Sequence, residues 1–176
     1  ESMNEEFDGT YDGDPNKEYY ANLNQYNQIF VDTVRGTGEK NTHRWLLVPG
    51  WNTNIEYTIG DYGFEMPTDE KCSAGESRMM VSVHYYDPWD YCGIEDLKTI
   101  LWGEYGDNLI EVNGFPKMNK AKWGDESYLD DLFSRMQEKF VKNDIPVIIG
   151  EYGCIDKSSA YADFAGQIGR ASCRER

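Results

Sequence analysis

The chain has 176 residues, enough for one domain with a sizeable hydrophobic core, and its net charge is −15 at pH 7. This acidity argues against a nucleic-acid partner, because such a partner requires a basic surface on the protein. The sequence contains no run of about 18 apolar residues, so we expect no segment that spans a membrane.

The start of the chain predicts the end of a strand, followed by a loop and a helix. Asn4 and Glu5 stand at the expected end of that strand. Residues 18–35 are expected to form a helix, because apolar side chains recur every three or four residues, and Gly36 or Gly38 ends it. The expected inward face of the helix consists of Leu23, Tyr26, Phe30 and Val34.

The middle of the chain predicts two buried strands. The first covers residues 44–48 and is expected to stop at Pro49 and Gly50, before a long loop. The second covers residues 78–84. Residues 90–125 show no clear periodicity, and we expect an irregular stretch there, of the kind that is usually functional in a compact domain.

The end of the chain predicts a helix over residues 127–142, capped by Asp125 or Ser127, and a strand over residues 146–153. The inward face of that helix is expected to hold Leu129, Phe133, Met136 and Phe140. The apolar run of residues 147–149 is typical of a parallel strand buried on both faces. Because buried strands alternate with helices, the predicted fold class is α/β with parallel strands.

Four cysteines lie far apart in the sequence: Cys72, Cys92, Cys154 and Cys173. Their spacing matches no zinc or redox motif, so we expect no metal and no cofactor. Free thiols are favoured, and one disulfide stays open as an alternative. Residues 168–176 break the composition of the chain with three arginines and almost no apolar side chain, and we expect this tail, including Cys173, to be non-native.

Polar and aromatic residues follow each predicted strand: Asn4 and Glu5, then Trp51 and Asn52, then His84, Tyr85, Tyr86 and Trp89, and finally Glu151. Parallel strands would bring them to one edge of the sheet. Two carboxyl groups there suit the hydrolysis of a glycosidic bond, which needs one protonated and one ionised acid. Each residue taken singly also has a structural explanation, such as a helix cap for Asn4 and Glu5 or a hydrogen-bonded histidine for His84.

Five stretches of the sequence resemble glycoside hydrolase family 5, and most of all its subfamily of endo-β-1,4-glucanases, xyloglucanases and mixed-linkage glucanases. They are residues 1–5, 45–54, 82–89, 123–128 and 146–153, of which the His-Tyr-Tyr-Asp-Pro-Trp and Gly-Glu-Tyr-Gly motifs are the most specific. The resemblance implies a partial (β/α)8 barrel with parallel strands, roughly strands four to seven. It places the C-terminal part of the catalytic barrel in residues 1–167.

The resemblance also implies roles for single residues. Glu5 matches the general acid/base and Glu151 matches the nucleophile. Asn4 matches the asparagine that binds the sugar 2-hydroxyl, while His84 and Tyr86 match the pair beside the nucleophile.

Two tryptophans also match the family, whereas several other positions differ from its pattern. Trp51 and Trp89 stand where substrate-facing aromatics occur. The proline that usually follows the Asn-Glu pair is replaced by Glu6, and the family's arginine of strand two, histidine of strand three and tryptophan of strand eight have no counterpart. The resemblance therefore implies an internal piece of a gene, which we expect to be inactive by itself.

The implied function is a retaining endo-β-1,4-glucanase that acts on plant β-glucan polysaccharides or oligosaccharides. A xyloglucanase or β-mannanase on the same frame is the alternative among enzymes, and a non-catalytic glucan-binding domain is the alternative from another class. The family implies a secreted or cell-surface bacterial protein.

Overall fold

The structure is a computed structural model that describes residues 1–4, 17–95, 98–115 and 117–157. The chain divides into two compact units. The sheet unit comprises residues 1–85 and 132–151, and the second unit comprises residues 86–131 and 152–176 as far as they are described. Glu5, the expected acid/base, and the expected non-native tail at 168–176 lie outside the described residues.

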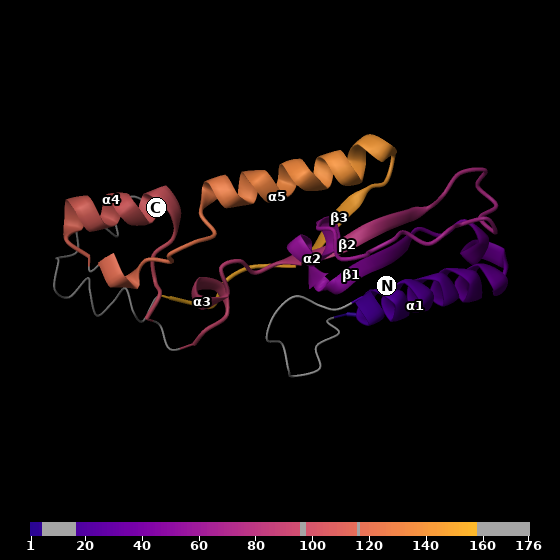
Figure 1. Cartoon of the computed structure of the whole chain (residues 1–176), viewed down its shortest axis with the longest axis horizontal. Coiled ribbons are helices and arrows are strands. Elements are labelled where there is room, and N and C mark those ends of the chain that lie inside the picture. The colour runs from indigo at the N-terminus through magenta and orange to yellow at the C-terminus, as the bar shows by residue number, and fades with distance from the viewer. Residues whose placement is uncertain (5–16, 96–97, 116, 158–176) are drawn as a thin grey trace. The chain divides into compact units, whose positions relative to one another are not determined.

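The sheet unit contains three strands, β1 (Leu46–Asn54), β2 (Met79–Tyr85) and β3 (Val147–Tyr152), in the spatial order β1-β2-β3 (Figure 1). The strands are parallel, so the prediction of an α/β fold with a parallel sheet is confirmed. The expected fourth strand at the start of the chain does not appear, because the described residues 1–4 have no strand conformation.

Strand β1 is longer than predicted, since it continues through Pro49 and Gly50 to Asn54. The pairing register with β2 shifts between Pro49 and Asn54, and Asn52 and Thr53 in that interval each have φ of 50°. Such an irregularity lets a strand continue past residues that disturb regular pairing. The prediction that the Pro-Gly pair ends the strand is therefore wrong.

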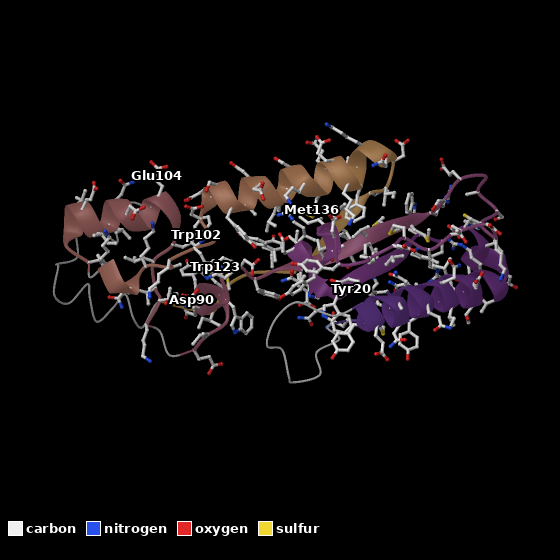
Figure 2. The ribbon with its side chains drawn as sticks, viewed as in Figure 1. Tyr20, Asp90, Trp102, Glu104, Trp123 and Met136 are labelled. Atoms are coloured by element: carbon white, nitrogen blue, oxygen red, sulfur yellow. The ribbon has the colours of Figure 1, made fainter. Side chains whose placement is uncertain are left out.

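Helix α1 (Lys17–Gly36) has almost the predicted bounds, but Leu23 is the one residue of its predicted inward face that is buried. The buried positions are Tyr20, Leu23, Asn27, Val31 and Arg35. Tyr26, which was expected inside, is 56% exposed. The face was misplaced because it includes two polar side chains, which a search for apolar periodicity passes over. Figure 2 labels Tyr20 at the start of the helix.

Helix α2 (Ile55–Ile59) follows β1 directly and is held by the second long helix of the sheet unit. Two guanidinium nitrogens of Arg135 donate to the carboxylate of Glu56 at 2.7 and 2.8 Å. Lys139 Nζ donates to the carbonyl oxygens of Thr58 and Ile59, both at 3.1 Å. These carbonyls end α2, so Lys139 satisfies acceptors that a short helix leaves without partners of its own.

That long helix is α5 (Glu126–Lys139), which is followed by the short helix η3 (Val141–Asn143); the division between the two units falls within α5. Asp125 caps it as predicted, because its Oδ1 accepts from the backbone N–H of Tyr128 at 3.2 Å. Its buried side chains are Leu132 and Met136, with Phe140 directly after it. Phe133, which was expected inside, is 40% exposed.

Strand β3 is an exposed strand, although its apolar run predicted burial on both faces. Its side chains are half-buried or exposed throughout, and Ile148 is 37% exposed. It lies at the end of the strand order, where β2 is its one neighbour among the described strands, and burial on both faces would require layers that cover both sides of the sheet.

The second unit contains α3 (Trp89–Cys92), α4 (Gly103–Asn113) and η2 (Lys117–Asn119). A small core holds it together: Ile100, Leu101 and Phe115 are buried, with Leu109 and Ile110 packed against them. The backbone N–H of Glu104 donates to the Glu126 carboxylate at 2.9 Å, and Trp102 Nε1 donates to the Gly124 carbonyl at 2.5 Å (Figure 2). Helix α4 was not predicted, because two glycines and few apolar positions obscure its periodicity.

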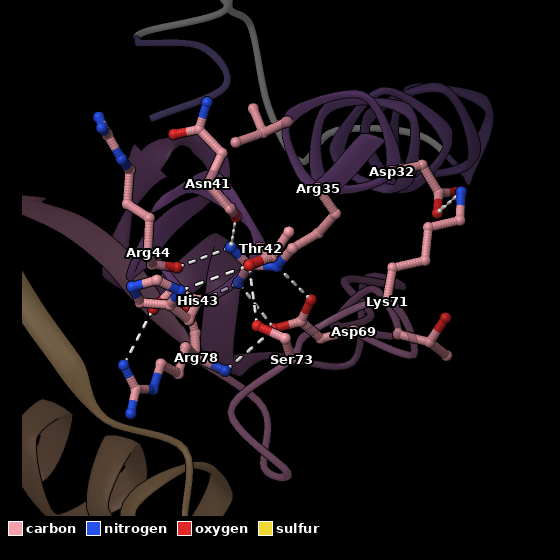
Figure 3. Close-up of polar contacts among 12 residues, drawn as sticks. Asp32, Arg35, Asn41, Thr42, His43, Arg44, Asp69, Lys71, Ser73 and Arg78 are labelled. Atoms are coloured by element: carbon pink, nitrogen blue, oxygen red, sulfur yellow. Dashed lines mark hydrogen bonds and ion pairs between the residues drawn. The ribbon is translucent and has the colours of Figure 1, made fainter. Parts of the chain in front are cut away.

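A buried arginine joins the amino ends of β1 and β2 to the end of α1, which is followed by the short helix η1 (Glu39–Thr42) (Figure 3). Arg35 Nε and Nη2 donate to the two carboxylate oxygens of Asp69 at 2.8 and 2.9 Å. Arg35 Nη1 donates to the carbonyl oxygens of Asn41 and Arg44, both at 2.7 Å. The backbone N–H of Arg78 donates to Asp69 Oδ2 at 3.0 Å. One ion pair therefore contacts the segments that lead into both strands.

The ion pair is almost fully removed from solvent, with side chains 0% and 1% exposed. The hydrogen bonds from Arg35 hold the pKa of Asp69 below its ordinary value, and the same bonds raise the pKa of Arg35. Both groups are therefore charged at neutral pH, and each depends on the other for its burial.

We predict that Asp69→Ala lowers the free energy of unfolding by about 3–5 kcal/mol, because it leaves the buried Arg35 charge without its partner. Urea unfolding followed by circular dichroism measures the change. The matched control is Asp32→Ala, which breaks the exposed pair of Asp32 and Lys71 and should leave the unfolding midpoint almost unchanged (Figure 3). Equal effects of the two substitutions would contradict the anchoring role of Arg35.

Candidate active site

The carboxyl ends of the three parallel strands carry the polar residues of the candidate site. Asn54 at the end of β1 pairs in register with His84 of β2. Glu151 lies near the end of β3, the strand next to β2. The sheet unit therefore brings His84 and Glu151 to the same edge, as the sequence predicted.

His84 and Glu151 are in direct contact. His84 Nδ1 lies 3.4 Å from Glu151 Oε2, which is at the long end for a hydrogen bond. The His84 side chain is 5% exposed and that of Glu151 is 45% exposed. The histidine is thus buried inside the sheet unit, beside a carboxylate of which a large part stays accessible.

The imidazole of His84 is held in place by its neighbours on β2 and β3. Ser82 and His84 are two residues apart on β2, so they point to the same face, and both are buried. A Cβ added at Gly150 would lie 3.5 Å from the His84 ring atoms Cδ2 and Nε2 and 3.5 Å from Ser82 Oγ. The backbone of β3 therefore passes close to the ring, at the residue directly before Glu151.

The segment that carries Asn4 is tied to α1 and β1 by a residue that sequence patterns did not single out. Ser2 Oγ donates to Asn27 Oδ1 at 2.5 Å, and Asn27 Nδ2 donates to the Pro49 carbonyl at 3.0 Å. Asn27 is fully buried. Asn27 lies four residues after Leu23, and this helical spacing was the signal in the sequence that could have placed it on the buried face. Asn4 itself is exposed, and its contact with a sugar hydroxyl stays a prediction.

Trp51 packs against two tyrosines of α1. Its ring is stacked on that of Tyr19, with centroids 5.0 Å apart and an interplanar angle of 14°, and it is tilted against Tyr20 at 6.3 Å. Stacking covers one face of the indole, so packing accounts for part of its presence. A contact of Trp51 with substrate stays a prediction.

The second unit holds Tyr86 and Trp89. Their rings meet edge to face, with centroids 6.2 Å apart, and Trp89 is 56% exposed. The hydroxyl of Tyr128 donates to Asp87 Oδ2 at 3.2 Å and thereby steadies the same segment. The flat surface of Trp89 is available to a ligand, whereas the contact of Tyr86 with the nucleophile stays a prediction.

The described part of the chain contains no group of three or more histidine, cysteine or acidic side chains arranged to hold a metal ion. Among the same residues, no helix is both long enough and apolar enough to cross a membrane.

Comparisons with known proteins identify the family to which these residues point. The family model described as cellulase (glycosyl hydrolase family 5) matches residues 1–171. Endoglucanase A of Paenibacillus barcinonensis is 53% identical over 163 residues, which are 90% of this chain and 38% of that protein. A xyloglucan-specific endo-β-1,4-glucanase of Bacteroides ovatus is 34% identical over 142 residues, which are 79% of this chain and 25% of that protein.

A solved structure agrees with these matches. The family 5 xyloglucanase from Paenibacillus pabuli, in complex with ligand, aligns with a TM-score of 0.80 and 50% sequence identity. The alignment covers 95% of this chain and 45% of the xyloglucanase. The chain therefore spans less than half the length of each of these three relatives.

We predict that Gly150→Ala leaves the imidazole of His84 nearly undisturbed, because a methyl group at 3.5 Å makes ordinary contacts. Gly150→Val should displace the ring, since its further methyl groups have to enter the space of His84 or Ser82. Nitrogen-15 NMR of the histidine side chains measures the difference. The chain has two histidines, and the exposed His43 is the internal control. Unshifted His84 signals in the valine variant would contradict the close approach of β3.

Proposed function

The chain belongs to the cellulase family, glycosyl hydrolase family 5, and on that premise we propose that the whole protein is a retaining endo-β-1,4-glucanase. The observation that carries the proposal is the contact of His84 Nδ1 with Glu151 Oε2 at the carboxyl edge of the parallel sheet. In barrels of alternating strands and helices, that edge is where catalytic groups lie. A partial (β/α)8 barrel, roughly strands four to seven, is the matching proposal for the fold.

Glu151 is the proposed nucleophile. A retaining enzyme attacks the anomeric carbon with a carboxylate and forms a covalent glycosyl-enzyme, which water then hydrolyses. Attack requires an ionised carboxylate with one accessible face. Glu151 keeps 45% of its side chain exposed, which leaves it accessible to a substrate, and His84 Nδ1 lies 3.4 Å from its Oε2.

Glu5 is the proposed general acid/base, which protonates the leaving oxygen in the first step and deprotonates water in the second. Asn4 precedes it and would donate to the 2-hydroxyl of the sugar in the same subsite. Tyr86 would orient the carboxylate of Glu151 together with His84. These assignments rest on the family and on the positions of the residues in the sequence.

Trp51 and Trp89 are the proposed sugar-binding aromatics. An indole presents a flat apolar face on which a sugar ring can stack. Trp89 is the stronger of the two candidates, because it is 56% exposed, while Tyr19 stacks on one face of Trp51.

The proposed substrate is a plant β-1,4-glucan chain, with xyloglucan as the second candidate. Endoglucanase A of Paenibacillus barcinonensis supports the first, and the xyloglucanases of Paenibacillus pabuli and Bacteroides ovatus support the second. Such polymers are too large to enter a cell, so the proposal includes secretion or display at the cell surface.

Two hybrid proteins test the proposed function. In one, Endoglucanase A of Paenibacillus barcinonensis supplies the residues that this chain lacks; in the other, the Paenibacillus pabuli xyloglucanase supplies them. We predict that both hydrolyse barley β-glucan and carboxymethylcellulose, and that proton NMR shows the first products in the β configuration. If both hybrids prefer the same substrate, the preference is determined by the residues of this chain. First products in the α configuration, or two inactive but folded hybrids, would overturn the proposal.

We predict that Glu151→Gln abolishes turnover in either hybrid, even with an activated aryl glycoside, because no nucleophile remains. Glu5→Gln should spare the first step for such a substrate, since a good leaving group needs little protonation. Azide should then restore turnover of the Glu5 variant by attacking the glycosyl-enzyme, and the product should be a β-glycosyl azide. Steady-state kinetics with and without azide make the measurement. Rescue of the Glu151 variant with retained configuration would reverse the two roles.

A further inference from the structure

Two cysteines of the second unit, far apart in the sequence, lie side by side. The backbone N–H of Ile155 donates to the carbonyl oxygen of Cys92 at 2.9 Å. Cys154 directly precedes Ile155, so this bond brings the backbone of Cys154 close to that of Cys92. Disulfides require a Cα separation of roughly 4.4–6.8 Å, and one backbone hydrogen bond plus one peptide step keeps the two cysteines near this range.

The two thiols also interact electrostatically. Burial raises the pKa of the Cys92 thiol to about 11, and the next contribution comes from Cys154. Both thiols are free in the structure, with Cys92 buried and Cys154 exposed. Cys72, the third described cysteine, belongs to the sheet unit and has no comparable neighbour among the described cysteines.

We propose that Cys92 and Cys154 form a redox-sensitive modification site, a pair that closes to a disulfide and ties the segment after β3 to the end of α3. The bond would fasten the chain just beyond Glu151 to the helix that carries Trp89. It goes beyond the proposed hydrolytic function, because it concerns the loops around the strand ends and no step of the reaction.

The oxidant is a soluble disulfide, and the reaction is two successive thiol–disulfide exchanges. The exposed Cys154 thiolate attacks the soluble disulfide, forms a mixed disulfide and releases one thiol. The Cys92 thiolate then attacks Cys154 Sγ, which breaks the mixed disulfide and releases the second thiol. Two electrons and two protons pass from the cysteine pair to the soluble disulfide, which becomes two thiols.

The second exchange depends on pH, because it requires the Cys92 thiolate. Burial is the main cause of the raised pKa of Cys92; Cys154, Asp87 and Asp90 raise it further, and Lys157 lowers it. The thiolate fraction increases as the pH rises toward about 11. The mixed disulfide at Cys154 should therefore accumulate near neutral pH and close faster in alkaline buffer.

Oxidised glutathione and peptide mapping test the pair on the 176-residue chain. Mass spectrometry of a non-reduced digest should show a Cys92–Cys154 cross-link as the main disulfide in native buffer, and a mixture of pairings in concentrated urea. Cys154→Ser should abolish the cross-link, and Cys72→Ser, the matched control, should leave it intact. Closure should raise the midpoint of thermal unfolding by roughly 5–10 °C, because it restricts the unfolded chain.

Three results would overturn the proposal. One is a native disulfide map that equals the map in urea. Another is a Cys154–glutathione adduct that never closes in alkaline buffer. The third is a native cross-link in which Cys154 pairs with Cys72 or Cys173. We choose Cys154 for the substitution because it is exposed, so its replacement by serine leaves the buried core around Cys92 unchanged.

Discussion

The buried ion pair of Arg35 and Asp69 is the interaction on which the sheet unit depends. Its hydrogen bonds reach the carbonyl of Arg44, just before β1, and the backbone N–H of Arg78, just before β2. The two strands then pair in register from Leu46 and Met79 onward. The register then shifts between Pro49 and Asn54, and this irregularity brings Asn54 opposite His84. The ion pair thus anchors the start of the sheet, and the irregularity in β1 sets which residues meet at its other end.

The two edges of the sheet use polar groups in opposite ways. At the amino edge, Arg35 and Asp69 are hidden from solvent and satisfied by each other and by backbone groups. At the carboxyl edge, Glu151 keeps 45% of its side chain exposed and has His84 beside it. A buried, saturated pair cannot react with a ligand, whereas a half-exposed carboxylate can. This division agrees with barrels in which one face supports stability and the other carries the chemistry.

Aromatic side chains are divided in the same manner. Tyr20 is buried and its hydroxyl donates to the carbonyl of Tyr57, and Trp51 extends this group through its stacking on Tyr19. Trp89 is open to solvent. Tryptophan therefore packs against α1 in one element, β1, and is a candidate binding surface in another, α3, and sequence position alone does not separate these roles.

Local patterns in the sequence determined the elements that depend on short-range forces. The bounds of α1 and β2, the Asp125 cap of α5 and the polar residues after the strands could all be predicted, because periodicity, capping and strand ends are properties of neighbouring residues. The tertiary structure decided the rest. The buried face of α1 includes Asn27 and Arg35, and their burial requires hydrogen-bond partners that lie outside the helix. Strand β3 is exposed despite its apolar run, and the proposed pairing of Cys154 with Cys92 depends on a backbone contact between distant segments. Burial of a polar group, exposure of an apolar strand and the meeting of two thiols depend on what the fold brings beside them, which one-dimensional patterns do not record.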